Sequence, residues 1–178
     1  MKIAIIGYSG SGKSTLAAYL GELYKIPVLH LDTVRFLPNW VERDKDEEAA
    51  IVKDFMDRNE EGGWVIDGNY TSVHYDRRMA EADSILFLSF SRFTCLRRAI
   101  RRYRTFRGRV RPSAAEGCNE KIDFAFVKWI LLDGRTKARR ARYSEVMARY
   151  PEKFIRIKNQ RALTAYTERV KKESEATV

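Results

Sequence analysis

The sequence predicts an α/β fold in which a doubly wound, parallel, five-stranded sheet lies between two layers of helices. Short apolar runs alternate along the chain with longer segments whose apolar residues recur at helical spacing, as in β-α-β units. Three of the apolar runs end at a glycine-rich turn or at an aspartate, and sheets of this class bind ligands at the carboxyl ends of their strands. With 178 residues, 44% of them apolar, the chain is long enough to bury one such core.

Five strands are expected, each at a short apolar run of the kind that forms a buried parallel strand. Their ranges are 2–6, 27–31, 64–66, 84–90 and 154–157. The expected helices span 12–24, 44–59, 91–106, 120–132, 135–149 and 161–172. Asp44 and Ser91 are suited to cap two of them. Gly108, Pro112 and Gly117 predict a loop over 107–119.

The charge of the chain predicts an anionic partner. The formal net charge is +10, and residues 97–111 hold eight arginines and no acidic residue. Phosphorylated nucleotides and nucleic acids both fit this charge, and a solvated basic face is the alternative. Cys95 and Cys118 are too few for a disulfide framework or a four-cysteine zinc site. No apolar run approaches the ~20 residues of a membrane span, and the apolar start 1–6 is too short for a signal peptide, so we expect a cytoplasmic protein without a membrane partner.

A phosphate-binding turn follows the first expected strand. Residues 7–14 read GYSGSGKS and match the pattern GxxxxGK[ST] between an apolar strand and a helix. The glycines let successive backbone N–H groups point into one concavity, and the helix N-terminus adds its dipole. We therefore expect ATP and Mg²⁺ as ligands. The expected nucleotide-binding residues on this turn are Gly7, Ser9, Gly10, Ser11, Gly12, Lys13, Ser14 and Thr15.

Two aspartates at strand ends are the candidate partners of this turn. Asp67 follows the third expected strand and is expected to bind Mg²⁺ together with the hydroxyl of Ser14. Asp32 follows the second strand and is expected to orient the acceptor hydroxyl or take its proton. A turn aspartate and a helix cap, respectively, are the alternatives. Arg35 is expected to hold an anionic group of the acceptor, although a surface arginine would give the same pattern.

The arginine-rich segment and the two histidines are the last parts of the sequence to be assigned. The helix after Ser91 has an apolar stripe at Phe93, Leu96, Ile100 and Tyr103, and arginines at i, i+4 and i+7 on another face: Arg97, Arg101 and Arg104. The spacing repeats at Arg135, Arg139 and Arg142. Arginines on a mobile segment can stabilise a transferring phosphoryl group. We expect 97–142 to be a basic lid that uses four residues, Arg101, Arg135 and Arg139 in catalysis and Arg107 on the nucleotide. His30 and His74 have no ligand spacing and are expected to be structural or solvated.

These motifs give the chain a resemblance to adenylate kinases and their relatives. The P-loop, the D-x-x-R of residues 32–35, the Asp-Gly of residues 67–68 and the arginine-rich lid carry it. Within that superfamily the chain is most similar to bacterial DNA topology modulation proteins (FlaR-related). The segments that carry this second likeness are His30-Leu31-Asp32, Pro38-Asn39-Trp40, Asp67-Gly68-Asn69-Tyr70, Arg111-Pro112, Ala115-Glu116-Gly117-Cys118 and Lys128-Trp129.

The resemblance implies one P-loop kinase domain over 1–178, of the nucleoside monophosphate kinase type, using ATP and Mg²⁺. Adenylate kinases continue the Asp-Gly with Phe-Pro-Arg, and that arginine binds the acceptor phosphate. Asn69, Tyr70 and Thr71 stand in those places here, so Asn69 and Tyr70 are expected on a different, nucleotide- or sugar-like acceptor. The alternatives are an ATP-binding, DNA-associated regulator and an ATPase switch without an acceptor. No helix-turn-helix or zinc-finger pattern supports the regulator.

Overall fold

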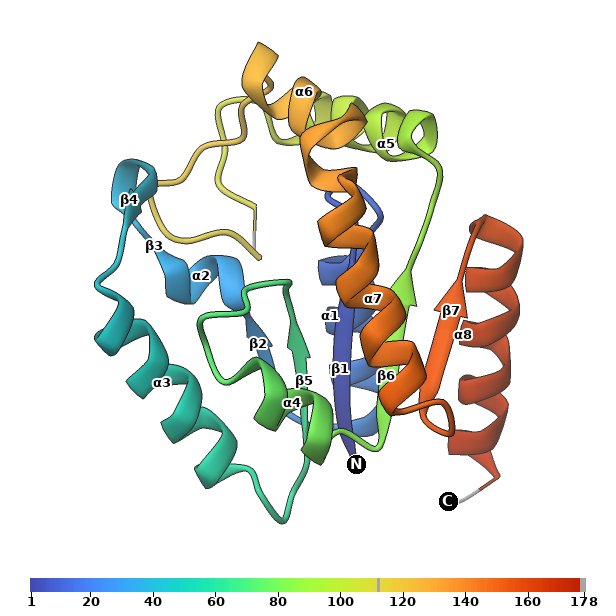
Figure 1. The fold of residues 1–178 in the computed structure, drawn as a ribbon. Helices are drawn as coiled ribbons and strands as arrows, with labels where there is room; N and C mark the ends of the chain where they lie inside the picture. The colour runs from blue at the N-terminus through green and yellow to red at the C-terminus, as the bar shows by residue number, and fades with distance from the viewer. Residues whose placement is uncertain (112, 177–178) are drawn as a thin grey trace.

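The fold is built on a five-stranded parallel sheet, whose strands run side by side through the middle of Figure 1. The structure is a computed structural model and describes residues 1–111 and 113–176. The strands stand in the order β2 (Val28–His30), β5 (Trp64–Asp67), β1 (Lys2–Gly7), β6 (Ser84–Leu88) and β7 (Phe154–Ile157), and every pairing is parallel. The predicted sheet is therefore confirmed. A short antiparallel hairpin, β3 (Phe36–Leu37) and β4 (Val41–Glu42), stands apart from it.

Helices cover both faces of the sheet because successive strand residues point to opposite sides. Ile3 and Ile5 of β1 pack on one side with α1 (Lys13–Tyr24), α5 (Arg92–Phe106), α6 (Phe124–Leu131) and α8 (Gln160–Glu175). Ala4 and Ile6 pack on the other with α2 (Leu31–Arg35), α3 (Lys45–Arg58), α4 (Tyr75–Glu81) and α7 (Lys137–Arg149). The three-layer α/β architecture is thus the one that the alternation of apolar runs predicts.

The predicted caps are confirmed, whereas some short elements were missed. The Asp44 side chain accepts from the backbone of Asp46 and Glu47, and Ser91 accepts from Thr94. The second strand ends at His30, because Leu31 begins the short helix α2. That helix, α4, the β3–β4 hairpin, and 3₁₀ turns at Pro38–Trp40 and Asp133–Arg135 were not expected. Each is too short to show a period in the sequence.

Helix α5 faces its neighbours with a different side from the predicted one. Its buried residues are Cys95 and Ala99, while Phe93 of the expected apolar stripe is 74% exposed. The reason lies in the turn after β1. A Cβ at Gly10 would be 2.5 Å from the Cys95 carbonyl oxygen, so the helix packs directly on that turn. Only the face with small side chains allows so close an approach.

Strand order decides which side chains meet at the carboxyl edge. Strand β5 lies between β1 and β2, so Asp67 is adjacent to the turn after β1 and Asp32 is one strand further away. Among the described residues, no helix is both long enough and apolar enough to span a bilayer.

Candidate active site

The turn after β1 has the geometry of a phosphate-binding loop. Gly10 and Gly12 have φ of +77° and +97°, which L side chains rarely adopt, so glycine is required there. Helix α1 begins immediately afterwards at Lys13, and its first N–H groups face the same concavity. The surface of the adjoining cavity includes six of the predicted residues: Ser9, Gly10, Gly12, Lys13, Ser14 and Thr15. Gly7 and Ser11 are both buried beneath it.

Side chains from three distant segments hold this loop in place. Asn69 Oδ1 accepts from the backbone N–H of Gly7 at 2.9 Å, and Asn69 Nδ2 donates to the Gly7 carbonyl at 2.6 Å. Arg98 donates to the backbone carbonyl of Ser11. Trp129 Nε1 donates to Ser9 Oγ at 3.0 Å. Asn69 was expected on the acceptor, but both polar atoms of its amide are used by the loop, so it acts as a support.

Lys13 is held in a partly desolvated position at the centre of the site. Its Nζ donates to the Tyr8 carbonyl at 3.2 Å. Burial lowers the pKa of Lys13, and the charges of Asp67 and Asp32 oppose that shift. A bound phosphate would add a further favourable charge beside the Lys13 ammonium group.

Ser14 and Asp67, which are expected to hold Mg²⁺, are in contact at the carboxyl edge of the sheet. Ser14 Oγ donates to Asp67 Oδ2 at 2.8 Å, and His30 Nδ1 contacts Asp67 Oδ1. Two neighbouring oxygen donors at a phosphate-binding loop fit Mg²⁺, which keeps several waters and takes few protein ligands. Among the described residues, no group of three or more His, Cys, Asp or Glu side chains that could hold a metal ion is found. His30 was expected to be structural or solvated. It instead lines the cavity, because β2 ends beside β5.

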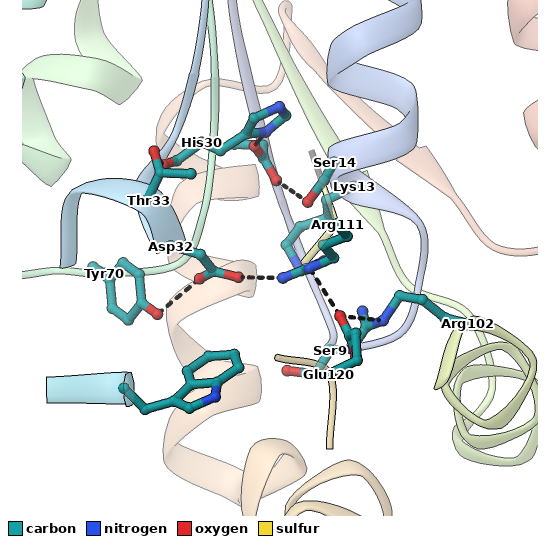
Figure 2. Close-up of polar contacts among 12 residues, drawn as sticks. Ser9, Lys13, Ser14, His30, Asp32, Thr33, Tyr70, Arg102, Arg111 and Glu120 are labelled. Atoms are coloured by element: carbon teal, nitrogen blue, oxygen red, sulfur yellow. Dashed lines mark hydrogen bonds and ion pairs between the residues drawn. The ribbon is translucent and has the colours of Figure 1, made fainter. Parts of the chain in front are cut away.

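Asp32 lies across the cavity, held on both sides (Figure 2). Tyr70 OH donates to Asp32 Oδ1 at 2.8 Å, and Arg111 Nη2 donates to Asp32 Oδ2 at 3.1 Å. The carboxylate is still 41% exposed, so it can accept a further hydrogen bond. Burial, followed by the charge of Asp32, raises the pKa of Tyr70. The phenol therefore stays a donor and fixes the orientation of Asp32.

A buried carboxylate joins Asp32 to the arginine-rich segment. Arg111 Nε and Arg102 Nε lie 2.9 Å and 3.0 Å from the same oxygen of Glu120, whose side chain is 3% exposed. Figure 2 shows this chain running from Asp32 through Arg111 and Glu120 to Arg102. Neither Arg102 nor Glu120 was expected to have a role in the site. Arg111 was named only for the resemblance, together with Pro112, which lies outside the described residues.

The four arginines chosen from the lid take different positions. Arg101 and Arg139 line the cavity, and Arg139 also stacks on Trp129 with its guanidinium 4.3 Å from the ring centre. Arg107 is exposed and does not line it. Arg135 lies 3.7 Å above the Tyr8 ring and donates to the carbonyls of Ile130 and Phe90, so it is committed to packing under the loop. Helical spacing could not separate these positions, since it does not say which face meets the site.

One cavity connects the phosphate loop, the Ser14–Asp67 pair, Asp32, Arg101 and Arg139. Its volume is about 1480 Å³, which exceeds the usual size of a site for one small ligand. It extends from the phosphate loop toward α8 on one side and toward the β3–β4 hairpin on the other. The members of its lining that the sequence analysis missed include Arg98, Arg102, Glu120 and Trp129. Arg98 and Arg102 belong to the arginine-rich segment 97–111, each one residue after a member of the predicted face, Arg97 and Arg101.

Comparisons with known proteins bear on the fold alone. No protein-family model matches the sequence, and no curated protein matches it. Among solved structures, a candidate kinase from Chloroflexus aurantiacus J-10-fl matches with a TM-score of 0.52 at 13% identity, over 96% of each chain. A gluconokinase from Sinorhizobium meliloti 1021 matches with a TM-score of 0.50 at 16% identity, over 99% of this chain and 96% of that one. The chain has the fold of the P-loop kinases. Identities this low say nothing about the acceptor.

Proposed function

We propose that the protein is an ATP- and Mg²⁺-dependent phosphotransferase that acts on a hydroxyl of a small molecule. One observation carries the proposal. The phosphate-binding loop with Lys13, the Ser14–Asp67 pair and the exposed carboxylate of Asp32 all face a single cavity large enough for two ligands. A phosphate site, a metal pair and a group that can orient a nucleophile are the parts that phosphoryl transfer needs.

The residues of this chain would divide the work between the two ligands. The loop N–H groups and Lys13 would hold the β- and γ-phosphates of ATP. Mg²⁺ held by Ser14 and Asp67 would neutralise the phosphate oxygens. Arg101 and Arg139 line the cavity and would add positive charge as the γ-phosphoryl group moves. Arg98 also lines the cavity, and its contact with the Ser11 carbonyl holds the loop that would carry the phosphates.

Asp32 would orient the acceptor. It has two fixed neighbours and an exposed side, so an acceptor hydroxyl can donate to it while pointing at the γ-phosphorus. The hydroxyl oxygen then bonds to that phosphorus as the bond to the bridging oxygen breaks. The electron pair of the broken bond stays on ADP. The hydroxyl proton passes to Asp32 and from there to solvent.

A nucleic-acid-binding regulator is the second candidate, and the resemblance to DNA topology modulation proteins stays a prediction. Some arginines of the lid segment are exposed and do not line the cavity, among them Arg107 and Arg140, and these could contact a phosphate backbone. Others line the cavity or support the loop, as Arg139 and Arg98 do. That division favours the kinase, because arginines that line the cavity or hold the loop face a bound ligand and not a nucleic-acid backbone.

The test is ADP formation with a panel of nucleosides, nucleotides, sugars and small alcohols, together with calorimetry of Mg–ATP binding. Lys13→Ala should remove most of the ATP affinity and turnover, since it removes the charge that faces the phosphates. The matched control is Lys172→Ala, an exposed lysine on α8 that does not line the cavity. Unchanged ATP binding in a folded Lys13→Ala variant would contradict the assignment.

A further inference from the structure

The acceptor half of the cavity has a charge balance unlike the phosphate half. This half is bounded by Asp32, Arg35, Trp40, Tyr70 and the hairpin residue Glu42. Arg35 was expected to hold an anionic group, but its guanidinium is already occupied. Nη2 lies 2.8 Å from Glu42, and Nη1 lies 3.5 Å from Glu48, whose side chain is 1% exposed. The guanidinium also stacks on the Tyr70 ring at 4.7 Å.

The second arginine on this side is neutralised as well. Arg111 is shared between Asp32 and Glu120, and Glu120 also engages Arg102. Glu120 is nearly inaccessible, so it cannot turn outward to release its two arginines to a ligand. Removing one partner of a buried ion pair leaves an uncompensated charge, which is strongly unfavourable. An anionic acceptor would have to compete for these arginines against carboxylates that are fixed in place.

The phosphate half shows the opposite arrangement. Arg101 and Arg139 line the cavity, and neither has an ion pair with a carboxylate in the part of the chain that the structure describes. Arg139 stacks on Trp129, which donates to Ser9 of the phosphate loop. Positive charge is therefore available where the triphosphate would bind. On the acceptor side, three arginines face four carboxylates: Arg35, Arg102 and Arg111 against Asp32, Glu42, Glu48 and Glu120. Lys121 also lines this side, with its Nζ 5.7 Å from the centre of the Trp40 ring, and it pairs with Asp123 at 3.8 Å. Each of these cations on the acceptor side therefore has a carboxylate partner already.

The wall of the acceptor half carries an aromatic ring in a strained position. Asn39 and Trp40 both have left-handed backbone angles, with φ of +64° and +65°, although neither is glycine. This conformation is strained for residues other than glycine, and strain of this kind clusters at functional sites. Trp40 is held there by its Nε1, which donates to the Asn119 carbonyl at 3.2 Å, and by Phe36, whose ring packs edge-on at 5.2 Å. A flat ring in a cavity wall suits the apolar face of a sugar or nucleobase.

From this charge balance and this wall we infer that the phosphoryl acceptor is an uncharged ring compound with a free hydroxyl, a sugar or a nucleoside, that packs on Trp40. Glu42, Glu48 and Glu120 then act as selectivity residues, because they occupy the arginines that an acid or a phosphate monoester would need. The inference rests on the proposed function and narrows it to one class of acceptor.

The experiment measures ADP formation with matched pairs of neutral and anionic acceptors. The pairs are the common nucleosides with their 5′-monophosphates, and D-glucose with D-glucuronate. We expect at least one neutral member to raise ADP formation above the acceptor-free rate, with kcat/KM at least about tenfold above that of its anionic partner. Nucleoside and sugar pairs separate the two kinds of neutral ring. An anionic member that equals or exceeds its partner would overturn the inference, and so would a panel without any active neutral member.

Two variants test the charge argument directly. Glu42→Gln removes the exposed one of the two carboxylate partners of Arg35. Glu120→Gln removes the carboxylate partner of Arg102 and one of the two partners of Arg111. Both should reduce the preference for the neutral member about tenfold, through a gain in activity with the anionic one. The control is Glu47→Gln, whose surface pair with Arg43 lies outside the cavity. An unchanged preference in folded Glu42→Gln and Glu120→Gln would refute the assignment.

Calorimetry of Mg–ATP binding to the unmodified protein distinguishes failure of the proposed kinase activity from failure of the inferred acceptor class. Absence of Mg–ATP binding would refute the proposed kinase and the acceptor class together. Binding of Mg–ATP that depends on Lys13, combined with a preference for anionic acceptors, would leave the kinase standing and overturn only the acceptor class.

Discussion

Arg78 offers the sharpest test of how the acceptor side is held together. Its side chain is 0% exposed, and it has no carboxylate partner among the described residues. Its guanidinium donates to the backbone carbonyls of Val73 at 3.0 Å, Gly68 at 3.3 Å and Tyr70 at 2.5 Å. These three bonds fix the segment after β5 that presents the Tyr70 phenol to Asp32. We predict that Arg78→Met destabilises the protein and loosens this segment.

The size of the effect follows from these contacts. Methionine fills part of the volume but leaves three carbonyls without their donor, and each unsatisfied buried group costs about 1–3 kcal/mol. The loss is partly offset because a buried charge is removed, and burial lowers the pKa of Arg78 to about 10. We therefore expect a loss of about 3–5 kcal/mol in the free energy of unfolding, since such networks are costly to break from one side. For a chain of this size that is a fall in Tm of roughly 10 °C or more.

The assay is urea unfolding together with the acceptor KM, and the neighbouring arginine is the control. Arg77 pairs with Asp57 and Glu81 near the surface, so Arg77→Met should cost only about 0–1 kcal/mol. In Arg78→Met we also expect a raised acceptor KM with nearly unchanged ATP affinity, because the segment lies on the acceptor side. Equal stability losses in the two variants would refute the reasoning from buried carbonyls.

Three further predictions concern the catalytic groups. Burial lowers the pKa of Lys13 in the protein without ligand, and the charge of a bound phosphate would raise it. Mg–ATP binding should therefore take up a proton at a pH between these two pKa values. Calorimetry in two buffers of different ionisation enthalpy measures this, and Lys13→Arg should abolish it. Asp67→Asn should weaken metal-dependent turnover, whereas Asp32→Asn should lower phosphoryl transfer with ATP affinity nearly intact. Metal titrations check both, and loss of metal-dependent ATP binding in Asp32→Asn would reverse the roles. Arg101→Ala should lower turnover roughly a hundredfold with little change in stability, whereas Arg135→Ala should lower the unfolding temperature because it removes the packing on Tyr8. A stable, fully folded Arg135→Ala variant would contradict this.

The parts of the molecule that could be predicted from sequence are those fixed by local chemistry. The strand, glycine-rich turn and helix over 2–24 appear as expected, because a buried strand needs an apolar run and the turn needs glycine. Asp67 could be placed beside Ser14 because carboxyl ends of parallel strands share an edge. Five strands and the sheet class followed from the same alternation.

The parts that could not be predicted depend on how elements meet. Asn69 follows Gly68 directly, and its amide bonds the backbone of Gly7 at the end of the neighbouring strand. The residues around Asn69 in the sequence do not distinguish this structural role from ligand binding. Glu120 lies at the end of an irregular loop, and only the folded chain brings it between Arg102 and Arg111. Contacts of this kind join residues far apart in the sequence, so the spacing of residue types along the chain does not predict them.

Helix α5 shows why the failure of a local rule marks the site. Its apolar stripe predicts a buried Phe93, yet leaving a ring of that size mostly in water forgoes about 1.5–3 kcal/mol of burial. What replaces it is a close contact between the small residues of the helix and the phosphate loop, where Gly10 meets the Cys95 carbonyl. The same rotation turns Arg98 and Arg102 toward the cavity. Two arginines therefore face the cavity, while an apolar ring that packing alone would have buried stays exposed. Departures of this kind from the local pattern are expected at functional sites.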